Sequence, residues 1–309
     1  MPTTVKQPAS PYVGRFAPSP SGPLHMGSLV CALASFLEAR ANKGLWLVRI
    51  EDIDPPREQT GADKLILNCL NAHGLVADGP VLYQSSRHSA YTQTLAELSD
   101  RKLCYRCNCT RAKIKAAGGR YDQHCRHHPP PPEQPCALRL NLQRAYQATS
   151  RKALDIFTDQ TADTPLQIAE PNDDFVIYRK DGLFSYQLAV VVDDIAQGVT
   201  HVVRGSDLLS TTSSQRLLFS VLNHTPPQYT HLPIVTDHSG NKLSKQNHAP
   251  AVDPTNARNN LLSALHILGQ APPKPLQNAS TIEQILIWGQ EHWQLSKVPR
   301  GPVPITDRN

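Results

Sequence analysis

The residues best suited to chemistry in this sequence lie in a turn rich in proline and glycine at 15–28. A short apolar segment at 12–16 precedes the turn, and an apolar-periodic run at 29–41 follows it. A strand, a tight turn and a helix together present the N-terminus of the helix to an anionic ligand. His25 could add a hydrogen bond there, and Gly27 has no Cβ atom, so a ligand could approach closely. The pattern also fits an ordinary connection between a strand and a helix.

Carboxylates follow the next apolar segment. Glu51, Asp52 and Asp54 come directly after the near-continuous apolar run at 45–50, which is typical of a buried parallel strand. Open α/β sheets bind ligands beyond the carboxyl ends of their strands, so these side chains are candidates for a binding site. A solvated loop with helix-capping carboxylates is the alternative.

A third polar group lies in a loop rich in glycine and polar residues, where Lys242 and Lys245 flank Leu243 and Ser244. Two lysines on such a loop suit the neutralisation of phosphate charge. The alternative is a solvated pair of lysines.

Four of the seven cysteines lie between residues 104 and 125. Such clustering favours a metal site over disulfides in a cytosolic protein. Cys107, Cys109 and Cys125 are obvious thiolate ligands, and structural zinc prefers four tetrahedral ligands. General chemistry favours a histidine as the fourth, and reduced thiols without metal are the alternative. The candidates for that ligand are His124, His127, His128, Cys104 and Tyr121.

Length and composition place these groups in a globular protein. A chain of 309 residues is long enough for about two domains. No apolar run approaches the roughly 20 residues that cross a bilayer, and the first ten residues lack an apolar signal region, so we expect a cytoplasmic protein. The net charge of +5 is compatible with a polyanionic partner.

Hydrophobic periodicity predicts the elements that position the polar groups. Helices are expected at 28–42, 59–72, 91–102, 211–222, 256–268 and 281–293. Strands are expected at 12–16, 45–50, 136–140, 153–157, 175–178, 186–192, 201–205 and 231–235. The change in composition at Leu103 predicts an insertion, which gives four parts: 1–102 and 175–236 as the halves of one sheet domain, 103–174 as the insertion, and 237–309 as a loop with a helical C-terminal region.

Taken in order, the turn at 15–28, the segment 49–54 and the segment 242–245 resemble the catalytic domain of class I glutamyl-tRNA synthetases. The resemblance covers about 12–245 and implies an α/β fold with a doubly wound, parallel, Rossmann-like sheet. Only 64 residues follow Lys245 (309 minus 245), so the chain is most similar to the short paralogues of that class, the glutamyl-queuosine tRNA(Asp) synthetases.

The resemblance implies a reaction and its partners. Members of this family activate L-glutamate with ATP and Mg²⁺ without tRNA, and then transfer glutamate to the queuosine base in the anticodon of tRNA(Asp). The alternatives are a glutamyl-tRNA synthetase that charges a tRNA 3′ end, and a catalytically silent tRNA-binding paralogue. We expect a monomer without membrane contact.

The resemblance also implies roles for single residues. Arg15 and Arg204 would bind the carboxylates of glutamate, Glu51 its ammonium, and Tyr186 would add a hydroxyl and a wall; for Arg204, a surface ion pair with Asp207 is the alternative. The turn residues Phe16, Ala17, Pro18 and Ser19 complete the glutamate site. ATP would meet His25, Gly27, Ser28 and Lys245, with His25, Lys242 and Lys245 as the catalytic groups. The family signature commonly ends in a second histidine where this chain has Ser28. The resemblance selects Tyr121 as the fourth ligand of a structural zinc ion beside Cys107, Cys109 and Cys125.

Basic residues are frequent in and around the insertion, and they could meet tRNA phosphates or form a solvated basic face. They are Arg101, Lys102, Arg106, Arg111, Lys113, Lys115, Arg120 and Arg126.

Overall fold

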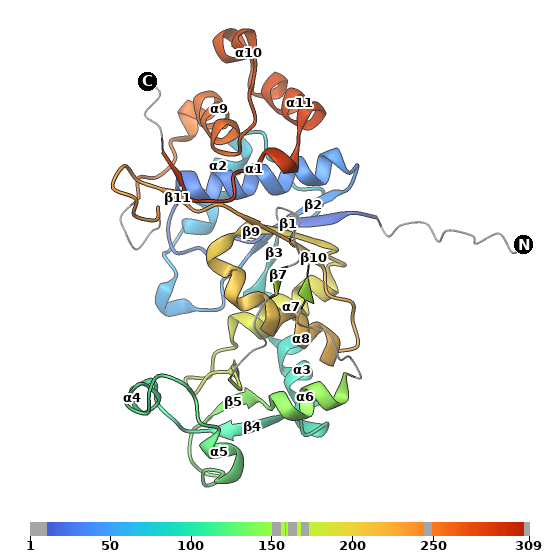
Figure 1. Cartoon of the computed structure of the whole chain (residues 1–309), viewed down its shortest axis with the longest axis vertical. Helices are drawn as coiled ribbons and strands as arrows, with labels where there is room; N and C mark the ends of the chain where they lie inside the picture. Colours follow the sequence, from blue (N-terminus) through green and yellow to red (C-terminus); the bar gives the residue numbers. More distant parts are fainter. Residues whose placement is uncertain are drawn as a thin grey trace, which may run out of the picture.

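The computed structural model has a twisted parallel sheet at its centre (Figure 1). The structure describes residues 11–149, 156–157, 159, 166–167, 173–243 and 249–305. The sheet consists of a three-stranded part, β1 (Val13–Phe16), β2 (Leu45–Ile50) and β3 (Leu82–Tyr83), and of a two-stranded part that packs beside it, β9 (His201–Gly205) and β10 (Gln228–Leu232).

The sheet has the strand order of a doubly wound fold. β1 pairs in parallel with β2, β2 with β3, and β9 with β10. β9 packs beside β1, where Thr200 donates its backbone N–H to the Val13 carbonyl at 2.9 Å. The chain therefore moves outward from β1 in one direction and from β9 in the other. The carboxyl ends of β1 and β9 form a topological switch point, the place where such sheets bind ligands.

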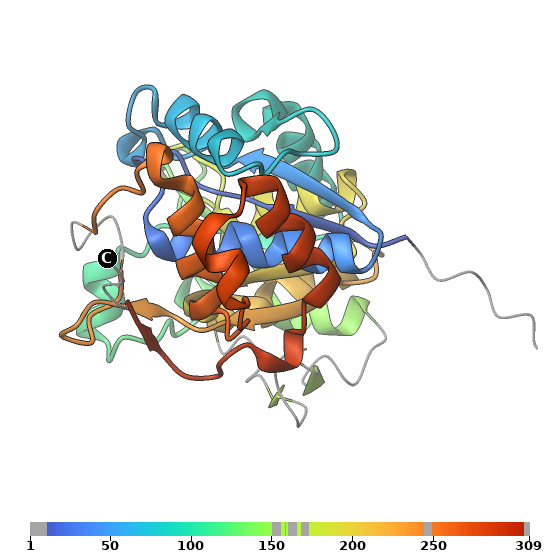
Figure 2. The same cartoon turned by 90° about the horizontal axis from the view of Figure 1, so that it is seen from above.

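Helices cover both faces of the sheet and create two hydrophobic cores. One core contains β1, β2, α1 (Met26–Ala41), α2 (Ala62–Ala72), α9 (Ala257–Ile267) and α11 (Ile282–His292). The other contains α3 (His88–Asp100), α7 (Tyr186–Ala196) and α8 (Thr212–Val221). Figure 2 shows α9 and α11 lying across α1, so the C-terminal helices complete the cover of one face. A Cβ atom on Gly289 of α11 would lie 3.1 Å from a methyl group of Leu37, which shows how closely α11 and α1 approach.

The insertion forms a separate small sheet below the parallel strands in Figure 1. β4 (Cys104–Cys107) and β8 (Val176–Tyr178) both pair antiparallel with β5 (Ala137–Leu140). β8 lies just beyond residue 174, where the sequence suggested that the insertion ends. The remaining elements of this region are α4 (Arg111–Ala116), α5 (His124–His127), α6 (Leu142–Ala148), β6 (Ile156–Phe157) and β7 (Leu166–Gln167).

Short elements complete the chain. β11 (Val235–Thr236) pairs in parallel with β12 (Val303–Pro304), and α10 (Lys274–Ala279) lies between α9 and α11, where the sequence indicated only a proline-rich connection. Among the described residues, no helix combines the length and the apolar character that a membrane crossing requires.

The strand expected at 186–192 is wrong, because this segment is the first part of α7. Ser185 caps the helix by accepting a hydrogen bond from the Leu188 N–H at 3.3 Å. Most of α7 is buried, so its valine-rich sequence has no polar face to reveal a helical period. The single strand expected at 231–235 is likewise two strands, since β10 ends at Leu232 and Pro233, which lacks an N–H, follows it.

Candidate active site

The N-terminus of α1 opens into the predicted phosphate site. His25 is the N-cap residue, and its Nδ1 accepts a hydrogen bond from the Ser28 N–H at 3.3 Å. The ring proton therefore resides on Nε2, which lies 3.1 Å from Ser28 Oγ and donates to it. Ser28 keeps its own hydroxyl proton for an acceptor such as a phosphate oxygen. A Cβ atom on Gly27 would lie 3.1 Å from His25 Cε1, so glycine lets the histidine ring fold over the helix end.

A pocket of about 420 Å³ joins this helix end to the carboxyl ends of β1 and β9. Almost every residue that the sequence assigned to glutamate and ATP lines it. These residues are Arg15, Phe16, Ala17, Pro18, Ser19, His25, Gly27, Ser28, Tyr186, Arg204 and Lys242.

Two buried arginines share one carboxylate at the floor of the site. Arg15 Nε and Nη2 donate to the oxygens of Asp194 at 3.2 and 3.3 Å, and Arg49 Nη1 donates to Asp194 Oδ1 at 2.7 Å. Arg49 also lies 3.4 Å from Glu51 Oε1. Asp194 comes from α7, so it fixes the arginines of β1 and β2 from the opposite layer.

The pKa values of the two carboxyl groups move in opposite directions. Burial tends to raise the pKa of Asp194, but the charges of Arg15 and Arg49 outweigh it and lower the pKa overall. Burial raises the pKa of Glu51, and Arg49 and Arg15 offset this only in part. The negative charge of Glu51 is therefore only partly balanced by the arginines, and a substrate ammonium could supply the missing positive charge.

Arg204 is bound only by neutral groups among the described residues. Its Nε donates to His231 Nε2 at 3.2 Å, and its Nη1 donates to Gln215 Oε1 at 2.7 Å. Its Nη2 donates to Thr212 Oγ1 at 2.7 Å and to the Leu208 carbonyl at 3.3 Å. The alternative ion pair with Asp207 is not formed, because Asp207 binds Lys242 at 2.7 Å. Arg204 is 5% exposed, so its positive charge lies beside the pocket with little contact with water.

Tyr186, the first residue of α7, joins this pocket to a larger one. Burial raises the pKa of its hydroxyl, and the charge of Glu51 raises it further, so the phenol stays protonated and can donate. The second pocket, of about 1010 Å³, lies between the catalytic sheet and the insertion and is lined by Glu51, Ser19 and Tyr186 at one end and by Arg111 of α4 at the other.

The loop that carries the predicted catalytic lysines is described only in part. Lys242 borders the smaller pocket and its side chain is 42% exposed. Lys245 lies outside the described residues, so its predicted role stays a prediction.

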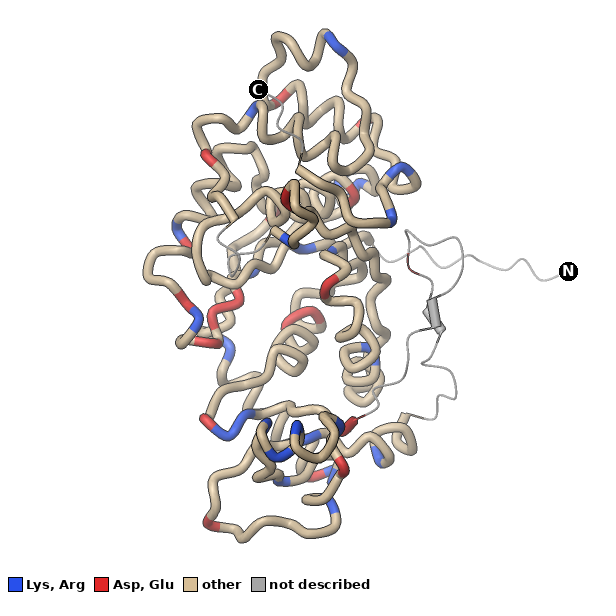
Figure 3. Tube along the Cα trace, turned by 60° about the vertical axis from the view of Figure 1, so that its left-hand side comes forward, with Lys and Arg blue, Asp and Glu red and all other residues tan. Residues whose placement is uncertain are grey.

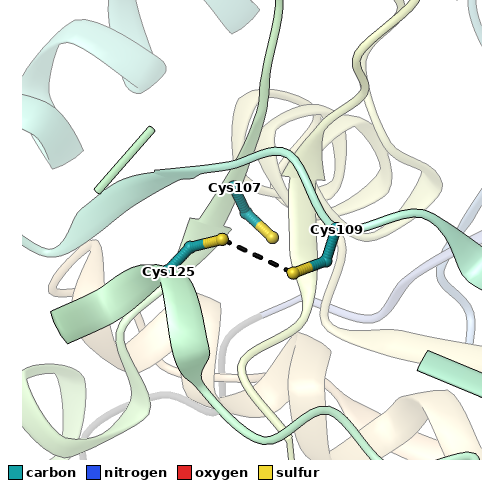
Figure 4. Close-up of side chains that lie close together, drawn as sticks. All are labelled: Cys107, Cys109 and Cys125. Atoms are coloured by element: carbon teal, nitrogen blue, oxygen red, sulfur yellow. Dashed lines mark hydrogen bonds between the residues drawn. The ribbon is translucent and has the colours of Figure 1, made fainter. Parts of the chain in front are cut away.

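Three of the cysteines converge in the insertion. The sulfur atoms of Cys107, Cys109 and Cys125 lie within 4.8 Å of one another, and those of Cys109 and Cys125 are 3.5 Å apart (Figure 4). The Tyr121 hydroxyl oxygen lies 3.4 Å from Cys107 Sγ and accepts the Cys125 N–H at 3.3 Å. Among the described residues, this group includes neither a histidine nor Cys104, whose sulfur meets Ser99 Oγ instead. Three sulfurs and one phenol oxygen can surround a metal ion that prefers four ligands.

Arg139 supplies a positive charge beside this group. Its Nε lies 3.2 Å from Cys107 Sγ, and its guanidinium carbon lies 3.9 Å from the centre of the Tyr121 ring. Burial alone would raise the pKa of Cys107, but hydrogen bonds with Tyr121 and Arg139 lower it overall. Arg139 therefore favours the thiolate that a metal ion needs.

Sequence reasoning missed several residues that complete the site. Asp194, Gln215 and Thr212 lie on helices whose sequences are typical of a hydrophobic core. The signal that could have identified them is a polar residue at a position where the pattern predicts burial. His231 gave no signal beyond its place in a strand.

The geometry has counterparts in known proteins. Residues 12–272 match the family described as tRNA synthetases class I (E and Q), catalytic domain. A Glutamyl-Q tRNA(Asp) synthetase from Vibrio cholerae is 50% identical over 297 residues, which is 96% of this chain and 95% of that protein. This chain belongs to the glutamyl-Q tRNA(Asp) synthetase family. A protein of the same name from Escherichia coli K12 is 48% identical over 94% of this chain and 92% of its own length.

Solved structures agree at the level of the fold. A glutamate tRNA ligase from Elizabethkingia meningosepticum, crystallised with its amino acid, matches with a TM-score of 0.74 at 24% identity. The match covers 96% of this chain and 67% of the ligase chain. The predicted family is confirmed, and with it the α/β catalytic domain of a class I synthetase.

Proposed function

We propose that this enzyme activates L-glutamate with ATP in the absence of tRNA and transfers the glutamyl group to the queuosine base of tRNA(Asp). The names of the relatives, at 48–50% identity over nearly the whole chain, support the acceptor. The pocket at the switch point supports the activation step. The single observation that carries the proposal is that Arg15, Tyr186 and Arg204 line the pocket at the N-terminus of α1, while Glu51 lines the adjoining pocket, which shares Ser19 and Tyr186 with it.

The charges of the pocket suit glutamate. The guanidinium groups of Arg15 and Arg204 lie at the smaller pocket, and the carboxylate of Glu51 lies at the adjoining one. Glutamate carries two carboxylates and one ammonium at neutral pH, so each of its charged groups has a counterpart of opposite charge. In our proposal Glu51 binds the ammonium, while Arg204 and Arg15, with the Tyr186 hydroxyl, bind carboxylate oxygens.

Activation would then depend on positioning and charge. The α-carboxylate attacks the α-phosphorus of ATP, pyrophosphate leaves, and glutamyl-adenylate forms. The Ser28 hydroxyl and the N–H groups at the start of α1 would hold phosphate oxygens, with His25 fixing the orientation of Ser28. Mg²⁺ accompanies ATP. Lys242 and Lys245 would neutralise the charge that develops on the leaving pyrophosphate.

The larger pocket is the place for the acceptor, because it reaches Glu51 and Tyr186 from the side of the insertion. Exposed Arg111, Lys113 and Lys115 on α4 would bind tRNA phosphates at its outer end, and Figure 3 shows basic residues gathered in this region. Four other predicted basic residues have partners within the chain: Arg126 forms a largely buried pair with Asp174, Arg101 and Arg120 form exposed pairs with Glu97 and Asp173, and Arg106 binds the carbonyls of the proline run.

We also propose that Cys107, Cys109, Cys125 and Tyr121 hold a structural zinc ion, and that the enzyme acts in the cytoplasm, where its substrates are. The sulfur distances and the nearby Arg139 support the metal site. Bound zinc would stabilise this part of the insertion, where Cys107, Tyr121 and Cys125 form a small buried cluster separate from the two large cores.

The test separates activation from transfer. Glutamate-dependent ATP–pyrophosphate exchange is measured without tRNA, and labelled glutamate is then offered with tRNA(Asp) that carries or lacks queuosine. A third tRNA carries queuosine but lacks its 3′-terminal nucleotide. We expect exchange without tRNA and transfer to both queuosine-containing tRNAs. Transfer that requires the 3′ nucleotide would instead indicate 3′-end charging, and absent exchange would indicate a silent paralogue.

A further inference from the structure

The unusual feature of Arg204 is the buried chain of hydrogen bonds behind it. His231 Nε2 accepts from Arg204 Nε at 3.2 Å, and His231 Nδ1 lies 2.5 Å from Asp159 Oδ2. Asp159 also accepts the His231 backbone N–H at 3.1 Å. Asp159, His231 and Arg204 are 1%, 7% and 5% exposed, so water competes little for these bonds.

One tautomer of His231 satisfies its hydrogen bonds to Asp159, Arg204 and Thr212. The Asp159 carboxylate can only accept, so Nδ1 must carry the proton. Nε2 then acts as an acceptor and faces the Arg204 Nε–H at 3.2 Å and the Thr212 hydroxyl at 3.1 Å. Burial lowers the pKa of His231; the bond to Asp159 opposes this, and the charge of Arg204 adds to it. The His231 ring is therefore neutral, and it accepts a hydrogen bond from Arg204 without adding a charge of its own.

The chain connects two distant parts of the sequence. Asp159 belongs to the region between α6 and β8, and His231 lies on β10, 72 residues later. Thr212 and Gln215 of α8 hold the two Nη atoms of Arg204, so His231 is what fixes its Nε edge.

We propose that Asp159 and His231 are positioning residues for glutamate recognition. Asp159 selects the Nδ1–H tautomer of His231, and His231 holds Arg204 in the orientation that presents its guanidinium group to a substrate carboxylate. The inference relies on the proposed role of Arg204 in glutamate binding.

Two substitutions at one position test the chain. In His231→Gln, the carboxamide oxygen can stand where Nε2 stood and accept from Arg204. In His231→Asn, the shorter carboxamide stands where Nδ1 stood and reaches only Asp159. We expect His231→Asn to raise the KM for glutamate at least about tenfold, as for the loss of one hydrogen bond to a charged group, with the KM for ATP unchanged. His231→Gln should recover most of the loss.

Asp159→Ala tests whether the pair acts as a unit. It should raise the KM for glutamate, and adding it to His231→Asn should have no further effect. His73→Asn is the matched control, because His73 is also buried but lies between α2 and α9. It should leave the KM for glutamate unchanged even where it lowers the melting temperature.

The outcomes separate this inference from the proposed function. Glutamate affinity is also measured by calorimetry with the full chain, which needs no turnover. If the wild type binds glutamate without exchange activity, the proposed function fails while the positioning role can still be judged. Equal effects of His231→Gln and His231→Asn, additive effects of the double variant, or a protonated Nε2 in the ¹⁵N spectrum of the His231 ring would overturn the inference.

Discussion

Asp194→Asn is the substitution that most directly tests how the site is held together. The Asp194 carboxylate lies between Arg15 and Arg49 and accepts three hydrogen bonds from them, at 2.7, 3.2 and 3.3 Å. Its side chain is 3% exposed, and those of the two arginines are 4% and 0% exposed. The amide has nearly the same shape, so the change removes charge and one acceptor without leaving a cavity.

The expected loss of stability is large because the arginines stay buried. Removing one partner of a buried ion pair destabilises a protein by about 3–5 kcal/mol. Asn keeps one oxygen that can accept from one arginine, which places our expectation near the lower end, at about 3 kcal/mol. Glu97→Gln is the control, since it breaks the exposed helix pair with Arg101 and should change stability by less than about 0.5 kcal/mol.

Urea unfolding at several pH values is the assay. The pKa of Asp194 is lowered in the folded state, so its stabilisation is fully present above the unfolded-state pKa of about 3.9 and is lost as the pH falls through the folded-state value. The difference between wild type and Asp194→Asn should therefore be constant near neutral pH and shrink in acid. A loss below about 1 kcal/mol at pH 7 would refute the view that Asp194 compensates both arginines.

Three further predictions concern the site and the insertion. Gly27→Ala should raise the KM for ATP several-fold, because its Cβ would press on the His25 ring at 3.1 Å; an unchanged KM would show that the ring is not needed in that position. Burial raises the pKa of Glu51, so glutamate binding should weaken as the pH is lowered from neutral, and Glu51→Gln should bind weakly at every pH without this dependence, as calorimetry can measure. Cys109→Ser should abolish binding of the proposed zinc ion, as elemental analysis can measure, and expose the insertion to protease while glutamate-dependent exchange persists; full zinc occupancy in the variant would contradict the proposed ligand set.

Local patterns in the sequence were sufficient for much of the fold. The strands at 45–50 and 201–205 have the predicted bounds, because a short apolar run between polar turns has few other ways to be buried. The helix after the signature turn was also correctly predicted. The same reasoning failed for α7, where burial on nearly every side removes the polar stripe that distinguishes a helix from a buried strand.

The site shows a similar division. Segments that follow strands of the sheet indicated His25 and Glu51, since the carboxyl ends of parallel strands meet at one edge, and the family resemblance added Arg15 and Arg204. No local pattern could indicate that Asp194 compensates Arg15 or that His231 holds Arg204. Those partners are separated by 179 and 27 residues in the chain.

The sequence by itself determined which chemical groups this protein can bring to a ligand and along which strands and helices they lie, because residue type and hydrophobic period are local properties. Only the tertiary structure decided the state of those groups. Packing α7 and β10 against the sheet compensates the charge of Arg15, leaves that of Arg204 available, and raises the pKa of Glu51. Charge compensation and desolvation depend on distances between groups remote in sequence, so they exist only in the folded chain.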